Sequence, residues 1–358
     1  MAYYYDNLKL DKGMYREAGR SFSQVLERED PSERYKGTSL EGLDAFQRQL
    51  KRFDIKVKGE GSDVVERFFQ TSDAAVLFPE YISRTVRQGM EEGDILPQIT
   101  AAITTIDGLD YRSITSQSGG AAKKSDEEEK MMAAADEDED EDETSDGSVI
   151  PEGADIPETT IKVQANLVKL RKRGRMLVAS YEAIRFQKLD LFSVALRQIG
   201  AYIARTQLED AVKVLINGDG NKNPADTTKL EGKPFDYNAL VEFWAKFDPY
   251  VMNTLLVSGD VMLQMLKMKE FQNPLTGLNF QGTGQLTTPL GATLLRTSVL
   301  PENIAVGLDK RFALEMVQSG GVMVEYDKLI DRQLERAAIT TISGFAKVFP
   351  EASRVMEL

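Results

Sequence analysis

The side chains that most often do chemistry in proteins are missing from this sequence. Its 358 residues include no histidine and no cysteine. Their absence excludes Ser-His and Cys-His nucleophile pairs, thiolate chemistry, disulfide bonds and the common zinc sites. Carboxylates and lysines are the acid–base groups that remain, and no pair of carboxylates stands out from the general acidity. We therefore predict no catalytic residue, cofactor or metal site, with a carboxylate-dependent enzyme as the alternative from another class.

Two short motifs have the composition of ligand-binding loops. In "NGDGNKNP", Asp219, Asn221 and Asn223 stand at the first, third and fifth positions of a calcium loop. Proline and leucine, however, occupy its sixth and twelfth positions, where glycine and glutamate are required. In "GTGQLTTPLG", residues 282–291, the glycines are not followed by the Gly-Lys-Ser/Thr of a phosphate-binding loop. The first motif is better explained as a turn that ends a helix, and the second as a flexible loop.

A third motif, "KLRKRGR", concentrates positive charge. Five basic side chains fall within seven residues, namely Lys169, Arg171, Lys172, Arg173 and Arg175. Such a cluster could contact phosphates, but nucleic-acid-binding proteins usually add stacking aromatic residues or a recognition helix, and neither is adjacent. We favour a solvated strand face, or one that meets acidic side chains of a neighbouring subunit, with direct DNA contact as the alternative.

An uninterrupted acidic row lies near the middle of the chain. It consists of Asp136, Glu137, Asp138, Glu139, Asp140, Glu141, Asp142 and Glu143. Residues 118–148 contain thirteen acidic and three basic side chains, so they carry ten of the thirteen net negative charges. Repulsion between neighbouring carboxylates favours disorder. We predict a solvated, disordered loop attached to a body that is otherwise close to neutral.

The first 70 residues predict helices separated by polar joints. In "GTSLEGLDAFQRQLKRF", Thr38 and Glu41 have the spacing of a capping box, and apolar residues follow at intervals of three and four over residues 40–53. This pattern indicates an amphipathic helix that must lie on another surface. Local packing onto the main body and a role as an assembly or scaffolding arm are both open.

The segments on either side of the acidic row predict a long hairpin. Residues 99–117 are rich in Ile and Thr without a helical stripe, and the chain after residue 148 again has the prolines and branched side chains of extended structure. A hairpin of this kind has no core of its own, and a two-stranded ribbon is marginally stable in water. We therefore expect it to rest on another molecule.

The rest of the chain predicts one long helix followed by alternating helices and strands. Apolar spacing indicates a helix over residues 190–217, about 40 Å long at about 1.5 Å per residue, with Asn217 and Gly218 as its stop signal. Further elements are expected as follows: a helix capped by Asp236, a buried strand in 253–259, a helix in 259–271, strands in 292–300 and 303–309, a short helix at 312–316, and strands in 322–349.

No targeting or membrane signal is visible. The N-terminus lacks the basic-then-apolar pattern of a signal peptide, and no apolar run approaches the roughly 20 residues of a membrane span. We expect a protein that is made and kept in a cytoplasm-like compartment, without a membrane partner.

Taken in order, these elements resemble the major capsid proteins of tailed bacteriophages, which have the Hong Kong 97-type fold that encapsulins share. Four stretches carry the resemblance: "FPEYISRTVRQGMEEGDILPQI", "ADIPETTIKVQANLVKLRKRGRMLVASYEAI", "LDLFSVALRQIGAYIARTQLEDAVKVLINGDG" and "PENIAVGLDKRFALEMVQSGGVMVEYDKLIDRQLERAAITTISGFAKVF". They look like the N-terminal arm, the return strand of the E-loop, the spine helix and the closing strands of that family.

The resemblance implies an α+β, Hong Kong 97-type capsid fold with a definite domain order. The expected parts are a helical segment at 1–75 that could serve as a scaffolding or arm region, an N-terminal arm at 76–98, an E-loop hairpin at 99–165 with the disordered insertion 118–148, a peripheral domain at 166–218 and 322–358 with the spine helix at 190–217, and an axial domain at 219–321.

The function that the resemblance implies is structural. We expect a subunit that assembles with copies of itself, as hexamers and pentamers, into the icosahedral head of a phage, built in the host cytoplasm around double-stranded DNA that it contacts non-specifically. A portal, a scaffolding segment or protein and a prohead protease are possible further partners. The alternative within the same fold is an encapsulin-like compartment.

Overall fold

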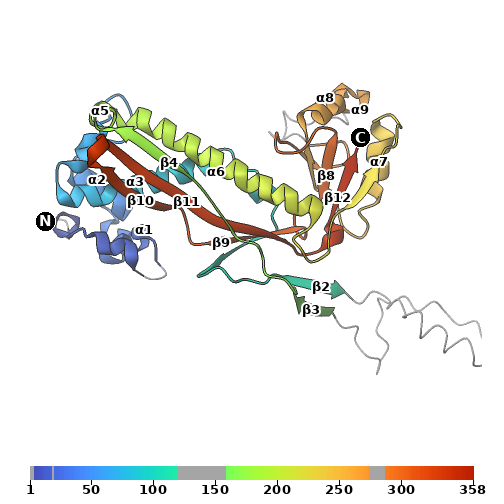
Figure 1. Cartoon of the computed structure of the whole chain (residues 1–358), viewed down its shortest axis with the longest axis horizontal. Coiled ribbons are helices and arrows are strands. Elements are labelled where there is room, and N and C mark those ends of the chain that lie inside the picture. Colours follow the sequence, from blue (N-terminus) through green and yellow to red (C-terminus); the bar gives the residue numbers. More distant parts are fainter. Residues whose placement is uncertain (1–3, 18–19, 119–158, 274–286) are drawn as a thin grey trace, which may run out of the picture.

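The computed structural model describes residues 4–17, 20–118, 159–273 and 287–358. The chain forms a larger body and a smaller body, and a narrow two-stranded hairpin extends beyond both (Figure 1). A long helix and a long strand run side by side through the larger body towards the smaller one. The mixture of helices with largely antiparallel sheets confirms the predicted α+β class.

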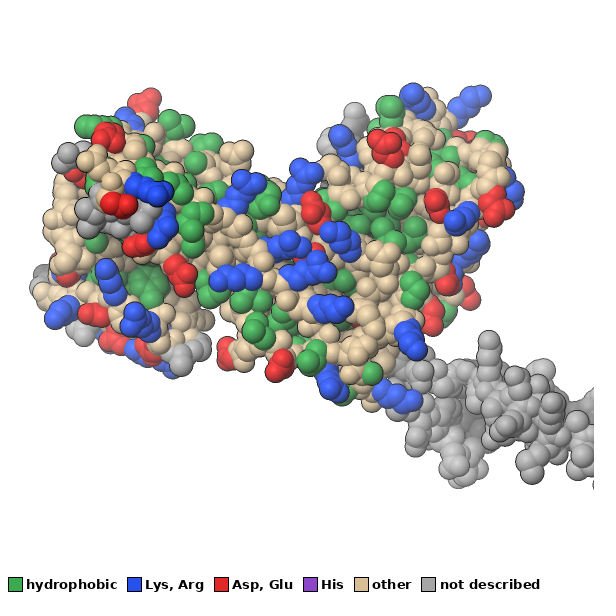
Figure 2. Space-filling model, viewed as in Figure 1, with side chains coloured by type: hydrophobic (Ala, Val, Ile, Leu, Met, Phe, Trp, Pro, Cys, Tyr) green, Lys and Arg blue, Asp and Glu red, His purple; other side chains and the backbone are tan. Residues whose placement is uncertain are grey.

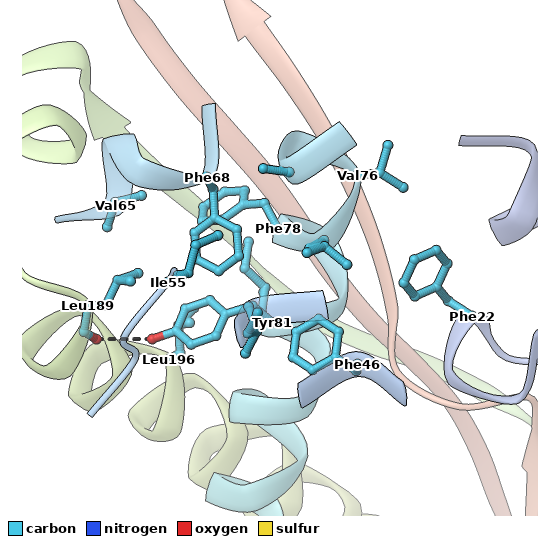
Figure 3. Close-up of a cluster of buried hydrophobic side chains, with 14 of the residues drawn as sticks. Phe22, Phe46, Ile55, Val65, Phe68, Val76, Phe78, Tyr81, Leu189 and Leu196 are labelled. Atoms are coloured by element: carbon cyan, nitrogen blue, oxygen red, sulfur yellow. Dashed lines mark hydrogen bonds between the residues drawn. The ribbon is translucent and has the colours of Figure 1, made fainter. Parts of the chain in front are cut away.

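The N-terminal residues form helices that pack onto the larger body. They are α1 (Phe22–Glu29), α2 (Ala45–Arg52) and α3 (Ser72–Glu91), with 3-10 helices at Tyr4–Asn7, Lys12–Arg16, Ser32–Tyr35, Val65–Phe69 and Leu96–Gln98. Aromatic side chains from this region, including Phe46, Phe68 and Phe78, share one buried cluster with Leu189 and Leu196 of the long helix (Figure 3). The apolar stripe that begins at residue 40 therefore packs locally in this structure.

The predicted start of α2 was wrong. Thr38 and Glu41 lie in a turn, and the helix begins only at Ala45, where Asp44 accepts a hydrogen bond from the backbone N–H of Gln47 at 2.8 Å. Gly42 explains the shift, because it adopts φ 83°, a left-handed conformation that ends any helical turn before it. Gln47 completes the actual capping box by accepting from the backbone N–H of Asp44.

The long helix predicted over residues 190–217 is present. It is α6, and it spans Leu189–Asn217, 29 residues against the predicted 190–217, after the short helix α5 (Tyr181–Phe186). Gly218 follows it with φ 82°, so a glycine ends the helix as expected. Much of the N-terminal arm predicted at 76–98 belongs to α3, which packs along α6; there Tyr81 donates a hydrogen bond to the Leu189 carbonyl at 3.0 Å (Figure 3).

The sheet of the larger body is built around one long strand. Its members are β1 (Ala102–Ile106), β4 (Arg171–Ser180), β9 (Leu314–Ser319), β10 (Met323–Leu329) and β11 (Leu334–Lys347), with a 3-10 helix at Ile330–Arg332. β11 pairs with β4 along one edge and with β10 and then β9 along the other, and β1 adds parallel to β9. Helices α3 and α6 cover one face of this sheet.

The predicted short helix at 312–316 was wrong. Its residues run into β9, where Leu314 pairs with Lys347 of β11 and Glu315 pairs with Ala102 of β1. The sequence "ALEMV" suits a buried helix or strand equally, and two flanking strands from distant parts of the chain decide between them. The strands expected within 322–349 are confirmed as β10 and β11.

The smaller body holds a second five-stranded sheet with helices packed on it. The strands are β5 (Asp226–Lys229), β12 (Ser353–Glu357, after a 3-10 helix at Pro350–Ala352), β8 (Ile304–Leu308), β6 (Thr254–Val257) and β7 (Thr293–Arg296), in that order. The helices are α7 (Tyr237–Ala245), α8 (Gly259–Lys267) and α9 (Lys269–Gln272).

Most predictions for the smaller body are confirmed. Asp236 caps α7 by accepting from the Ala239 N–H at 2.9 Å, and β6 is buried along its whole length. Of the flexible loop predicted at 282–291, residues 282–286 lie outside the described residues. One apolar cluster joins the two bodies at the end of α6, where Leu215 packs with Leu256 and Phe345. The domain boundaries themselves remain predictions.

No helix in the described ranges is long and apolar enough to cross a membrane.

Candidate assembly interface

A hairpin projects from the larger body, as the sequence predicts. Its strands are β2 (Ile114–Ser118) and β3 (Thr159–Val163), which pair antiparallel with Ile114 opposite Val163. The extended residues 99–117 are not one strand, however, because β1 belongs to the sheet of the body. Of the described hairpin residues, β2 and β3 extend beyond the body (Figure 1).

One face of the hairpin is apolar and has no cover in the described part of the chain. Ile114, Ile161 and Val163 share this face, and they are 47%, 66% and 63% exposed. The opposite face carries Thr115 paired with Lys162. We call Ile114, Ile161 and Val163 the apolar hairpin face. Large β-branched side chains exposed on an isolated two-stranded ribbon indicate a surface that packs against another protein surface.

The outgoing leg of the hairpin is fixed by one buried carboxylate. Glu315 of β9, which is 5% exposed, accepts hydrogen bonds from the hydroxyls of Thr104, Tyr111 (2.8 Å) and Ser113. Burial, together with the hydrogen bond to Glu315, raises the pKa of the Tyr111 hydroxyl, which keeps it protonated as a donor. Sequence reasoning missed Glu315, because its three donors lie more than 200 residues away in the chain.

The return leg is fixed by amide side chains at the end of α6. Asn166 donates through its backbone to Asn221 Oδ1 at 3.0 Å and through its side chain to the Gly220 carbonyl at 2.7 Å. Gln164 donates to the Lys347 carbonyl at 2.7 Å and accepts from Asn221 at 3.1 Å. The two legs of the hairpin are therefore tied to different elements of the body.

The calcium-like motif forms a structural turn, the interpretation that the sequence favours. Asp219 accepts from the backbone N–H groups of Asn221 (3.0 Å) and Lys347 (2.9 Å), while Asn223 accepts from the N–H of Asp219 at 3.1 Å. Within the described ranges no cluster of acidic side chains has the arrangement of a metal site. The motif's polar side chains serve the turn itself and the return leg of the hairpin.

Lys347, beside this turn, is fully buried. Its ammonium donates to the Leu215 carbonyl at 3.2 Å, at the C-terminal end of α6. Burial lowers the pKa of this lysine from 10.5 to about 8, although the charges of Asp219, Asp226 and Glu351 act in the opposite direction. The folded state therefore holds this proton more weakly than the unfolded chain does.

Replacing Lys347 with methionine should stabilise the protein at neutral pH. Because the pKa of Lys347 is lower in the folded state, its charge destabilises the folded state, and this destabilisation is fully present below pH 8. It disappears as pH rises from 8 towards 10.5, where the lysine loses its proton in the unfolded chain as well. The pKa shift corresponds to roughly 3 kcal/mol of destabilisation, which the methionine variant would not have. The variant also loses the hydrogen bond to Leu215, at a cost of about 1 kcal/mol, so we expect it to be more stable by about 2 kcal/mol at pH 7. Denaturant titrations at pH 7 and pH 10.5 should show the gain at the lower pH alone. Lys310→Met, at an exposed lysine, is the control; equal pH profiles for the two variants would contradict this account.

Replacing Glu315 with alanine should loosen the outgoing leg. Three hydroxyls lose their shared acceptor, and we expect local opening of residues 107–113 to become easier by about 2 kcal/mol, or roughly thirtyfold in exchange rate. Amide hydrogen exchange followed by mass spectrometry measures this. Glu325→Ala, at an exposed carboxylate on β10, is the matched control. Unchanged exchange in residues 107–113 of the Glu315 variant would show that the clamp does not hold the leg.

The basic motif lies on β4 and the residue pair before it, and its side chains divide between the two faces of the strand. Arg171 and Arg173 both bind Asp210 of α6, at 3.0 and 2.7 Å, and the guanidinium of Arg175 stacks over Tyr202 at 3.7 Å. Lys172 points to the other face, and Lys169 precedes the strand; both are exposed. The strand assignment is confirmed, but part of the acidic complement comes from Asp210 of the same chain rather than from a neighbour.

The remaining predicted residues are acidic. The acidic row Asp136–Glu143 lies outside the described residues. An intersubunit role for the basic residues remains a prediction.

Comparison with known proteins gives a family. The family model described as "Phage capsid protein" matches residues 164–346, just over half of the chain. This range contains Gln164 and Asn166 of the return leg, β4, α6, the smaller body except β12, and almost all of β11. No curated protein sequence matches significantly.

Several solved structures are similar in shape at low identity. A virus-like particle from Pyrococcus furiosus is 13% identical, with a TM-score of 0.49 over 78% of this chain and 99% of that one. Mycobacterium phage Che8 is 14% identical, with a TM-score of 0.45 over 70% and 85%. The capsid of a native GTA particle is 13% identical, with a TM-score of 0.49 over 76% and 90%. On the family match, this chain is a member of the phage capsid protein family.

Proposed function

We propose that this chain is the major capsid protein of a tailed phage, which assembles with copies of itself into the icosahedral shell around double-stranded DNA. Membership of the capsid family makes it a structural shell protein. The apolar hairpin face supports assembly with neighbouring copies, because the described part of the chain leaves this surface uncovered.

Covering that face with a neighbouring copy would release free energy. Burial of a valine or isoleucine side chain contributes about 1.5–3 kcal/mol, so the three exposed residues offer a substantial gain to whatever covers them. A hairpin that binds a different surface on the next copy makes a head-to-tail contact, and such contacts form closed rings where the rotation between copies closes. Hexamers and pentamers are the rings that a closed icosahedral shell requires.

The outer face of the larger sheet is a second uncovered surface. Helices α3 and α6 cover one face, whereas Met176 and Val178 of β4 and Met323 of β10 are exposed on the other. An open sheet face beside a projecting hairpin suits a subunit that is completed by its neighbours. A portal, a scaffolding function and a prohead protease would belong to the same assembly, with the subunit built in the host cytoplasm and ending in the virion.

Electron microscopy of the purified protein tests the proposal. Closed shells or ring-shaped capsomers are expected at high protein concentration and moderate ionic strength. A monodisperse monomer under the same conditions would contradict it and favour the enzyme alternative. An encapsulin-like compartment would also give shells, and the neighbouring genes distinguish the two: portal and terminase genes for a phage head, a cargo protein with a docking tail for an encapsulin.

A further inference from the structure

The seam between β4 and α6 carries an excess of positive charge. We define the basic seam as Arg171, Arg173 and Arg175 of β4 with Arg205 and Lys213 of α6. The ion pairs to Asp210 and the stacking of Arg175 on Tyr202 place the three arginines of β4 against α6. At about 100° per residue, Tyr202, Arg205 and Lys213 lie within about 80° of one another around the helix, on its exposed side. Figure 2 shows the corresponding band of Lys and Arg side chains across the middle of the molecule, where α6 and β4 run in Figure 1.

Acidic side chains of the same chain neutralise only part of this charge. Asp210, which is 7% exposed, is shared by Arg171 and Arg173. Arg205 approaches Glu209 at 3.9 Å, with its side chain 60% exposed. Within the described ranges neither Arg175 nor Lys213 has a carboxylate within ion-pair distance. The five cations of the seam therefore face two carboxylates, Asp210 and Glu209, and three positive charges remain uncompensated.

The complementary charge is present elsewhere in the same sequence. Residues 126–146 contain thirteen acidic side chains and one lysine, whereas residues 159–180 contain six basic side chains and no acidic one. In the chain, the acidic residues lie between β2 and β3, and the far ends of both strands point away from α6 (Figure 1). That direction favours the seam of an adjacent copy over the chain's own seam.

We infer that the acidic segment 126–146 of one subunit binds the basic seam of a neighbouring subunit in the shell. The inference rests on the proposed function, since it requires neighbours. Exposed ion pairs are individually weak and are screened by salt, so binding depends on several cations together and weakens as ionic strength rises. Packaged nucleic acid is the competing occupant of the seam, because phosphates would satisfy the same cations.

Cross-linking within assembled shells tests this assignment. Subunits labelled with ¹⁴N and ¹⁵N are mixed, assembled, checked by electron microscopy and treated with a carbodiimide, which joins carboxylates to lysine amines without a spacer. We expect cross-links from residues 126–146 to Lys213 of the seam, with mixed-isotope pairs at the level that random mixing gives. Their yield should fall severalfold between low and high salt under conditions in which the shells stay intact.

Two variants make the test specific. Arg205→Gln with Lys213→Gln neutralises the α6 side of the seam, and the remaining cross-links to Lys169 and Lys172, which flank it, should decrease. Lys267→Gln with Lys269→Gln, in α8 and α9 of the smaller body, removes two charges elsewhere and should change nothing.

Each other outcome overturns a defined part of the account. Intact shells with only same-isotope cross-links would show that the acidic segment binds the seam of its own subunit. Intact shells without any cross-link between the acidic segment and the seam would show that the two do not bind each other. Ultraviolet cross-links between the seam and nucleic acid, lost in the Arg205 and Lys213 variant, would assign the seam to nucleic acid. Micrographs without shells would overturn the proposed function, and this inference with it.

Discussion

Replacing Ile161 and Val163 with lysine should abolish shell formation and leave the subunit folded. Both side chains are more than 60% exposed, so the change costs the isolated subunit little. In a shell, two charges would have to be buried against the neighbour, and the apolar contribution of about 3–6 kcal/mol per contact would be lost as well. Because every subunit makes the contact, the protein concentration needed for shells to form should rise by orders of magnitude. Sedimentation velocity and electron microscopy measure this.

The opposite face of the hairpin supplies the control. Thr115→Glu places a charge beside Lys162 on the polar face, at a neighbouring position of the same ribbon. This variant should still assemble, and both proteins should keep the circular dichroism spectrum and the unfolding midpoint of the parent. Normal shells from the double lysine variant would show that the apolar hairpin face is not an assembly surface.

Replacing Gly200 with alanine should strongly destabilise the larger body. α3 and α6 cross where Gly89 and Gly200 face each other's backbones, and a Cβ at Gly200 would overlap the Val86 carbonyl oxygen and the Met90 nitrogen. A side chain at Gly89 would overlap Arg197 in the same way. The obstacle is backbone within two helices, which cannot move aside as a side chain could. We expect a loss of about 3 kcal/mol, the upper part of the range for overpacked cores.

Chemical denaturation, followed by a spectroscopic signal that reports on the larger body, measures the loss of stability in the Gly200 variant. Gly93→Ala is the matched control, because a Cβ there meets no atom within 4 Å. The control should be neutral within about 0.5 kcal/mol. A Gly200 variant as stable as the control would show that the two helices do not pack as closely as described.

Local patterns in the sequence predicted the elements whose structure is set locally. The three-and-four spacing of apolar residues and the Asn217–Gly218 stop predicted α6 to within one residue. Asp236 predicted the start of α7, and the apolar run ending at Val257 predicted a buried strand. In these segments propensity, capping and periodicity agree, so little depends on distant residues.

One failure occurred where distant residues decide the structure, and the other where a nearby glycine was overlooked. Residues 314–316 became part of β9 because β1 and β11 flank them. The spacing of Thr38 and Glu41 matches a capping box, but Gly42 ends the turn before a helix can form. Periodicity describes a segment by itself and cannot supply partners from elsewhere in the chain.

The candidate interface was predictable in outline but not in its contacts. Branched residues on both sides of a low-complexity segment indicated the hairpin, because that pattern is local. Glu315, Gln164 and Asn166 were missed, since a single polar residue in a sequence gives no sign of a partner in another element. Asp210 was missed for the same reason, although it lies 37 residues from Arg173 and neutralises it.

The central claim is that the hairpin of one subunit is completed by the next, and a cryo-electron microscopy map of the assembled particle tests it most directly. The account predicts that β2 and β3 of each subunit lie across an adjacent copy, with Ile161 and Val163 buried against it. A map in which the hairpin folds back onto its own body, or stands in solvent with those side chains exposed, would contradict the account.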